Sequence, residues 1–537
     1  MKRFTILPTV IGCFLMFILA DSAGAQHQEH GKVDFETSCN EQAEQFITNG
    51  IALIHHMMYE QAEINFEEAV SADPSCATAH WGIAMTVVHP LWGERPSDEN
   101  LEKGFKAIEK AMQLNPQTER EAGYISALEP FFRDWKSTSY PEQLAAFENG
   151  FQILYETYPD DVDAAAFYAL GQLATAPKDD QSFSKQEQAG QLLEEFHAKA
   201  PEHPGLFHYI IHAYDNPVLA EKAVDAASGY DKIAPDVPHA LHMPSHIFVR
   251  LGHWQDVVDW NQRSADAALR QPVNGMVSMH YLHALDYMMY AYLQQGEDNK
   301  AAEVMEKAVA LDNLQQTMAA AYAMATIQAR YPLELNNWEE AASIEPRSMN
   351  TISWDTYSGA ESISWFARGL GAARSGNAER AGEAIEALEG LYSKLKQEGE
   401  DYWAVLTEAH SLSVEAWLEY ADGNREQAVE LMKYAADLED SVDKHPVTPG
   451  HVLPARELLG DMYLLANQPE KALQAYERSL EISENRFNSL YGAGRAAQLA
   501  GNDELAKNYY SQLIENCQRN DIARPHFVAA SGFMSNQ

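Results

Sequence analysis

The sequence predicts an all-α protein built as one long solenoid of helical hairpins. Three observations support this fold class. At many points a turn residue is followed five positions later by a small or β-branched residue, as expected where the two helices of a hairpin pack closely. The composition, 46% hydrophobic and 22% charged, is that of a folded chain. The alternation of polar and apolar residues that marks β-strands is weak throughout.

The first hairpin lies in the stretch NGIALIHHMMYEQAEINFEEAVSADP, residues 49–74. Gly50, Ala62, Phe66, Ala69 and Pro74 fall at offsets 0, 12, 16, 19 and 24 from the glycine. These are the small, small, aromatic, small and proline positions of the tetratricopeptide (TPR) repeat, which the stretch therefore resembles. The glycine lets the second helix approach the first, the alanines form the packing face, and the proline ends the second helix.

The turn-to-packing spacing recurs toward the C-terminus. The pairs are Gly252/Val257, Gly296/Ala301, Asn336/Ala341, Gly376/Ala381, Gly423/Ala428, Asn467/Ala472 and Gly501/Ala506. The turn residues of the last two pairs are 34 residues apart, which is the TPR period. We therefore expect a right-handed TPR-type superhelix of about eleven to twelve hairpins.

The solenoid is expected to span residues 39–518, after a lead-in over residues 26–38 and before a C-terminal tail over residues 519–537. Residues 89–96, HPLWGERP, lengthen the turn inside the second hairpin. Residues 273–278 and 348–357 are expected to be loops between repeats.

Residues 1–25 have the features of a secretory signal peptide. Lys2 and Arg3 precede the apolar run ILPTVIGCFLMFIL, and AGA at residues 23–25 fits a cleavage site before Gln26. Cys13 faintly resembles a lipoprotein cysteine but falls in the middle of the apolar run, so simple export is preferred. No later stretch approaches the roughly 18 apolar residues of a membrane span. The mature protein is expected to be exported, periplasmic or extracellular, without membrane insertion.

The formal net charge of −41, from 38 basic and 79 acidic residues, excludes a nonspecific nucleic-acid binder. It is compatible with simple solubility, which we prefer, and with attraction of cations or basic ligands. Glycine-rich phosphate loops, G-x-S-x-G motifs and H-E-x-x-H motifs do not occur in the sequence. No reaction can therefore be assigned from a motif.

Cys39 and Cys76 open the first helices of the first two repeats, 37 residues apart. Successive first helices pack side by side in the same direction, so residues at matching ends can be neighbours. We expect a disulfide, worth about 3–4 kcal/mol, and the alternative is two buried thiols.

The histidines are concentrated in the central repeats, with ten of twenty between His197 and His283. In the TPR family the second, fifth and ninth positions of a first helix line the concave groove. With Gly252 as the turn residue, those positions are His239, His242 and His246. Pro244 lies between them and removes a helical hydrogen bond, so it leaves the direction of His239 and His242 open.

The neighbouring repeats extend this stripe. The preceding repeat contributes His208 and His212, and the following one contributes His283, Asp286 and Tyr290. Adjacent helices lie about 8–10 Å apart, close enough for side chains to meet between them. Imidazole groups bind zinc, copper, iron and nickel. The predicted metal-ligating set is His208, His212, His242, His246, His283 and Asp286, and it requires at least three ring nitrogens to converge within about 4–5 Å.

Two functions remain open at this point. The first is binding of a protein, peptide or small ligand along a concave groove lined by histidine and tyrosine. The second is a metal-dependent enzyme or metal-binding protein with a zinc, copper or iron site in the central repeats. The segments HALHMPSHIF, HYIIHAYD and DPSCATAHWGIAMTVVHPLW resemble a group of exported bacterial TPR proteins, which implies a shared feature here without naming a reaction. The more scattered histidines are interpreted as packing residues: His55, His56, His80, His89, His410 and His451.

Overall fold

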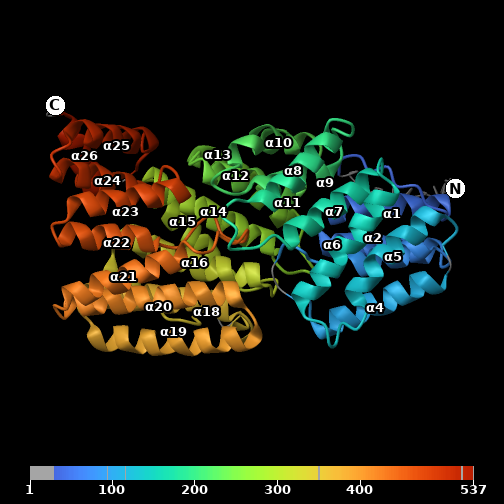
Figure 1. Ribbon diagram of the computed structural model, residues 1–537, viewed down its shortest axis with the longest axis horizontal. Coiled ribbons are helices and arrows are strands. Elements are labelled where there is room, and N and C mark those ends of the chain that lie inside the picture. Colours follow the sequence, from blue (N-terminus) through green and yellow to red (C-terminus); the bar gives the residue numbers. More distant parts are fainter. Residues whose placement is uncertain (1–29, 93–94, 115, 349–350, 522–523, 536–537) are drawn as a thin grey trace, which may run out of the picture.

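The protein is an elongated array of paired helices, seen in a computed structural model that describes residues 30–92, 95–114, 116–348, 351–521 and 524–535. The N-terminal and C-terminal helices gather at opposite ends, with the central helices between them (Figure 1). Within the described residues the β pairing amounts to two isolated bridges, Val273–Met276 and Val277–Leu314. The all-α solenoid predicted from the sequence is therefore confirmed.

The first part of the array consists of hairpins that end in short helices. Its elements are α1 (Glu41–His55), α2 (Tyr59–Ala72), α3 (Ala77–Met85), α4 (Asp98–Gln113), α5 (Glu119–Phe132), α6 (Tyr140–Thr157), α7 (Val162–Ala174), α8 (Ser184–His197), α9 (Pro204–Tyr214), η1 (Ala220–Ala223), α10 (Val224–Gly229) and η2 (Tyr230–Lys232). Helix α1 contacts α3 and also α9, so these repeats curl and bring α1 beside the central helices.

The central and C-terminal parts continue the pairing. Their elements are α11 (Pro238–His242), α12 (Pro244–Arg250), α13 (Trp254–Arg270), α14 (Met279–Gln295), α15 (Asp298–Val309), α16 (Met318–Glu334), α17 (Trp338–Ser343), η3 (Trp354–Thr356), α18 (Ser358–Ser375), α19 (Ala378–Glu398), α20 (Asp401–Ala421), α21 (Arg425–Glu439), α22 (Ala455–Leu465), α23 (Pro469–Ile482), α24 (Phe487–Leu499), α25 (Asp503–Asn516) and α26 (Pro525–Ser535). None of the described helices is both long and apolar enough to cross a bilayer.

In two of the TPR-like hairpins, the aromatic residue of the second helix packs between two glycines. Phe66 of α2 lies against Gly50 of α1 and Gly82 of α3, and a Cβ atom at Gly82 would lie 2.1 Å from the Phe66 ring. Tyr476 of α23 occupies the same position between the glycines of α22 and α24. This close packing explains the offsets seen in the sequence, since any larger side chain would separate the helices.

A disulfide links the first two repeats, and an additional helix packs on the C-terminal end of the solenoid. Cys39 and Cys76 form a disulfide with an S–S distance of 2.02 Å, the pair expected from the repeat register, whereas Cys517 is free and buried. The described part of the lead-in is extended and buries Phe35 against Trp81. The region expected as a C-terminal tail contains helix α26, which packs on α24 and α25. The predicted signal peptide, residues 1–25, lies outside the described residues.

The concave side of the central repeats is filled by the chain itself. Residues 440–454, between α21 and α22 and here called the inner segment, run across α12, α14 and α16. Arg250 pairs with Asp443 at 2.8 Å, and Tyr287 Oη donates to the Pro446 carbonyl at 3.2 Å. Arg330 donates to the carbonyl oxygens of Gly450 and His451 at 2.8 and 2.9 Å. Within the described part of the chain, the inner segment thus contacts the helices that an extended peptide would otherwise meet at these repeats.

Candidate functional site: a six-histidine cluster

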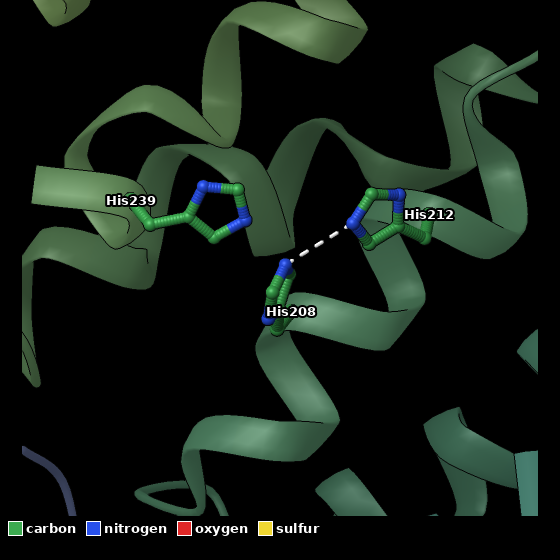
Figure 2. A group of neighbouring side chains, drawn as sticks. All are labelled: His208, His212 and His239. Atoms are coloured by element: carbon green, nitrogen blue, oxygen red, sulfur yellow. Dashed lines mark hydrogen bonds between the residues drawn. The ribbon is translucent and has the colours of Figure 1, made fainter. Parts of the chain in front are cut away.

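Two groups of three histidines meet in the centre of the molecule. The first histidine group is His208, His212 and His239, and Figure 2 shows their imidazoles turned toward one another from α9 and α11. The second histidine group is His242, His246 and His283, from α11, α12 and α14. Within each group, one ligand atom from every residue lies within 4.8 Å of the others. The convergence that the predicted metal site required is present.

The two groups are direct neighbours. The ring centroids of His212 and His246 lie 5.5 Å apart, and those of His242 and His283 lie 4.2 Å apart. His239 bridges toward the second group, with its centroid 6.1 Å from that of His242. Six imidazoles therefore form one continuous cluster.

The chain keeps its helical course through Pro244, which explains how His239, His242 and His246 share a face. Met243 between α11 and α12 has φ −52° and ψ −39°, which is helical. The amide of His246 donates to the Met243 carbonyl at 3.1 Å. The proline removes one hydrogen bond without bending the face away, because it stands at the first position of α12. His239, left out of the metal-ligating set predicted from the sequence, therefore belongs to the first group.

Hydrogen bonds fix the ring protons of the second group. The Asn261 amide donates to the Val257 carbonyl at 2.8 Å, so its oxygen faces His242 and accepts from His242 Nδ1 at 2.7 Å. His246 Nδ1 donates to the Asp215 carboxylate at 2.9 Å. In both neutral rings the proton is thus on Nδ1, and Nε2 carries only a lone pair.

Those two lone pairs face each other. His242 Nε2 and His246 Nε2 are 3.0 Å apart, with no proton available to join them in the neutral rings. Two nitrogens bound to one tetrahedral ion at 2.0–2.1 Å would lie about 3.3 Å apart. The spacing and the direction of the lone pairs therefore fit a shared metal cation.

The first group repeats part of this arrangement. His208 Nδ1 donates to the His55 carbonyl at 2.6 Å, which leaves its Nε2 as a lone pair 3.1 Å from His212 Nε2. Both ring nitrogens of His239 are buried without a hydrogen-bond partner in the described structure, as is Nδ1 of His283. Buried polar atoms of folded proteins usually have a partner in the protein, an ordered water or an ion, and these nitrogens are open to such a partner.

Burial keeps the histidines neutral. It lowers the pKa of His208 to about 3, although the hydrogen bond to the His55 carbonyl acts in the opposite direction. Burial also lowers the pKa values of His242 and His283 well below the ordinary value, helped by the neighbouring histidines. A hydrogen bond between the facing nitrogens would require one ring to be protonated, which burial disfavours. Neutral imidazole is the form that binds metals.

Asp215 is the polar centre behind the second group, and the sequence analysis missed it. Besides His246, it accepts from Arg250 Nε at 2.8 Å and from Lys444 Nζ at 2.9 Å. Burial alone would raise the pKa of Asp215, but Lys444 and Arg250 hold it well below the usual range. The carboxylate is thus ionised and orients His246. Lys444 belongs to the inner segment, far away in sequence, so no local pattern marks this contact.

A cavity of about 610 Å³ adjoins the cluster. The histidines on its wall include His212, His239, His246 and His283, together with His280, which the register had not selected. The cavity is also lined by Tyr59, at the start of α2, and by His89 and Trp92, in the lengthened turn of the second hairpin. His89, interpreted from the sequence as a packing residue, therefore lines the cavity as well as stacking on Tyr59 at 4.0 Å.

The structure does not place Asp286 and Tyr290 with the histidines. Arg330 Nε donates to Asp286 Oδ1 at 3.1 Å, and Arg486 donates to Tyr290 Oη at 3.0 Å. Both side chains contact arginines beside the inner segment, and neither lines the cavity. Including Asp286 in the metal-ligating set is corrected accordingly, since its carboxylate is engaged by Arg330.

A further cluster joins His55 and His203 to Asp163. Both Nε2 atoms lie near Asp163 Oδ1, at 3.0 and 3.2 Å, and Tyr209 Oη is 3.1 Å from His55 Nδ1. One carboxylate thus accepts from two rings. His203 Nδ1 is buried without a hydrogen-bond partner in the described structure, and the three ligand atoms lie within 4.8 Å of one another, as in the two histidine groups. The role of this cluster on the site is to fix α1, whose His55 carbonyl orients His208.

The chain is similar to known proteins in one family model and in several solved structures. A family model of the tetratricopeptide repeat matches residues 453–486, which cover α22 and α23. The human IFIT1 dimer with m7Gppp-AAAA is similar over 89% of this chain and 96% of its own, with 11% identity and TM-score 0.37. Yeast Tom70 is similar over 92% and 96%, with 11% identity and TM-score 0.30. No curated protein sequence matches the chain. The chain is an α-solenoid that contains a tetratricopeptide repeat.

Proposed function

We propose that this protein is an exported metalloprotein that holds two transition-metal ions in its six-histidine cluster and presents them to a small molecule in the adjoining cavity. The observation that carries the proposal is the distance of 3.0 Å between His242 Nε2 and His246 Nε2. Each ring donates its proton from Nδ1 to an acceptor, so both Nε2 atoms carry lone pairs. Three imidazoles for each ion leave an open coordination position, as in catalytic zinc sites. Zinc, copper and iron all accept such a donor set.

The alternative function, capture of a peptide or protein along the concave groove, is typical of TPR-type folds. It is less favoured at the central repeats because the inner segment already contacts α12, α14 and α16 there. A cavity of about 610 Å³ has the size of small-molecule sites. Export is supported by the Cys39–Cys76 disulfide, since disulfides persist in oxidising compartments.

The test is metal stoichiometry by elemental analysis after equilibration with zinc, copper(II) or iron(II) and removal of the excess. We expect two ions per chain in the unmodified protein, about one in His208→Ala and in His242→Ala, and none in the double variant. His253→Ala is the matched control, because this exposed histidine lies seven residues after His246, at the N-cap of α13 and outside both groups. A correctly folded protein that retains no ion of any of the three metals would refute the proposal.

A further inference from the structure

We infer that the cavity beside the six-histidine cluster takes a neutral aromatic molecule bearing a hydroxyl group, a phenol, with its oxygen toward the histidines and its ring toward Tyr59 and Trp92. This inference rests on the proposed metal site and names the class of molecule that the site would receive. It follows from the distribution of polar and aromatic groups over the cavity wall.

The polar atoms free to bind a ligand are concentrated at one end of the cavity. His280 and His283 line the wall, and their Nδ1 atoms are buried without a hydrogen-bond partner in the described structure. His239, beside them, has both ring nitrogens in this state. The oxygen of an occupant is therefore expected at this end, where it can reach a metal ion or an imidazole nitrogen.

Several polar side chains elsewhere on the wall are already engaged. Gln315 donates to Glu60 at 2.5 Å, and its oxygen accepts from the Met279 amide at 3.0 Å. Gln316 donates to the Thr351 carbonyl at 2.6 Å. Arg95 pairs with Asp98 at 2.8 Å. The rest of an occupant thus meets few groups that reward a polar or charged substituent.

The aromatic part of the wall includes Tyr59 and Trp92. Tyr59 stacks on His89 with centroids 4.0 Å apart, and Trp92 meets Tyr59 edge to face at 5.7 Å. The indole N–H of Trp92 is directed to the Met57 sulfur at 3.4 Å, so its polar atom is occupied while the ring borders the cavity. Aromatic rings pair favourably in such settings, and thioethers add contacts to ring edges.

A small molecule, rather than a polymer, matches the enclosure. The lengthened turn of the second hairpin supplies one wall and the inner segment supplies His445, Pro446 and Val447 to another. These two parts of the chain are more than three hundred residues apart in sequence, and both border the same space. An extended chain would have to displace the inner segment from its contacts with Arg250 and Arg330.

The test is calorimetric titration of the zinc-loaded full-length protein with phenol, toluene and cyclohexanol, after its zinc content has been measured. Phenol is expected to bind at least about tenfold more tightly than toluene, which lacks the oxygen, or cyclohexanol, which lacks the aromatic ring. Trp92→Leu is expected to weaken phenol binding about tenfold while the zinc content stays the same, and Trp92→Phe to restore most of it. Trp338→Leu is the matched control, because Trp338 lines a different pocket near the C-terminus.

The outcomes separate the two proposals. Protein that retains no zinc refutes the metal site itself. Zinc-loaded protein that binds no phenol, or that binds phenol, toluene and cyclohexanol equally, refutes the inference on the occupant alone. Benzoate serves as an additional probe: if it binds more tightly than phenol, the cavity selects negative charge and the inference is overturned.

Discussion

Replacing Asp215 with asparagine should weaken metal binding by the second histidine group about 10- to 100-fold. Asp215 accepts the Nδ1 proton of His246 at 2.9 Å, which fixes the ring orientation and makes Nε2 a better donor. The expected loss corresponds to about 1.4–2.8 kcal/mol of binding free energy. The same change removes the partner of the buried Lys444 Nζ, so the free energy of unfolding should also fall by about 3–5 kcal/mol.

The assay is competition for zinc between the protein and a chelator of known affinity, with calorimetric melting measured alongside. The matched control is Asp443→Asn. Asp443 pairs with the same Arg250, at 2.8 Å, but contacts neither histidine group, and its side chain is 24% exposed. We expect its zinc affinity to stay within about twofold of the unmodified protein, with a smaller loss of stability.

Either of two results would refute this reasoning. One is a folded Asp215→Asn protein with unaltered zinc affinity, which would show that the carboxylate does not orient a ligand. The other is an equal loss of affinity in Asp443→Asn, which would show that general destabilisation explains the effect.

Four further predictions concern stability and protonation. Burial lowers the pKa of His208 to about 3 from 6.5, so the unfolded chain binds more protons than the folded chain between these pH values. The metal-free protein should therefore lose stability as the pH falls below about 6.5. The midpoint of urea unfolding should be lower at pH 5 than at pH 7, and equal midpoints would contradict the argument. Zinc binding at pH 7 should release almost no protons, because the rings are already neutral; titrations in buffers of different ionisation enthalpy measure this, and release of several protons would disprove it. Cys39→Ala with Cys76→Ala should cost about 4 kcal/mol for a loop of 37 residues, measured by urea unfolding, and an unchanged free energy of unfolding would count against the staple. Gly82→Ala should destabilise the protein by about 1–3 kcal/mol, because the new Cβ would lie 2.1 Å from a buried aromatic ring. Gly382→Ala should stabilise the protein slightly, because the space around Gly382 is open. Equal melting temperatures for both variants would contradict the packing argument.

The repeat register predicted the fold well because the packing of successive helices depends on residues at fixed, short separations in the sequence. Glycine and an aromatic residue at fixed offsets describe how one helix packs on the next, and Phe66 against Gly82 is the physical form of that rule. The same register selected the histidines of three successive helices, since their first-helix positions point to one side. Local spacing was sufficient to select five members of the six-histidine cluster: His208, His212, His242, His246 and His283.

The contacts that the sequence did not predict join distant segments. Asp215 meets Lys444 over 229 positions, and the cavity wall combines Trp92 with Val447. Asp286 shows the same limit, because the register placed it with the histidines and could not reveal its partner, Arg330. Repeat spacing describes neighbours along the array and contains no information on a loop that returns across it.

The inner segment also changes how the array should respond to force, truncation or heat. In an ordinary repeat protein each unit touches only the next, so the ends fray and terminal units can be deleted one at a time. Here residues 440–454 tie α12, α14 and α16 to the hairpins that follow, and Arg486 of α24 bonds Tyr290 of α14 at 3.0 Å. A chain cut before residue 440 would lose the lid of the histidine cavity together with the hairpins beyond it. Central and C-terminal repeats should therefore melt as one cooperative block, which includes α14 and its His283 of the second histidine group.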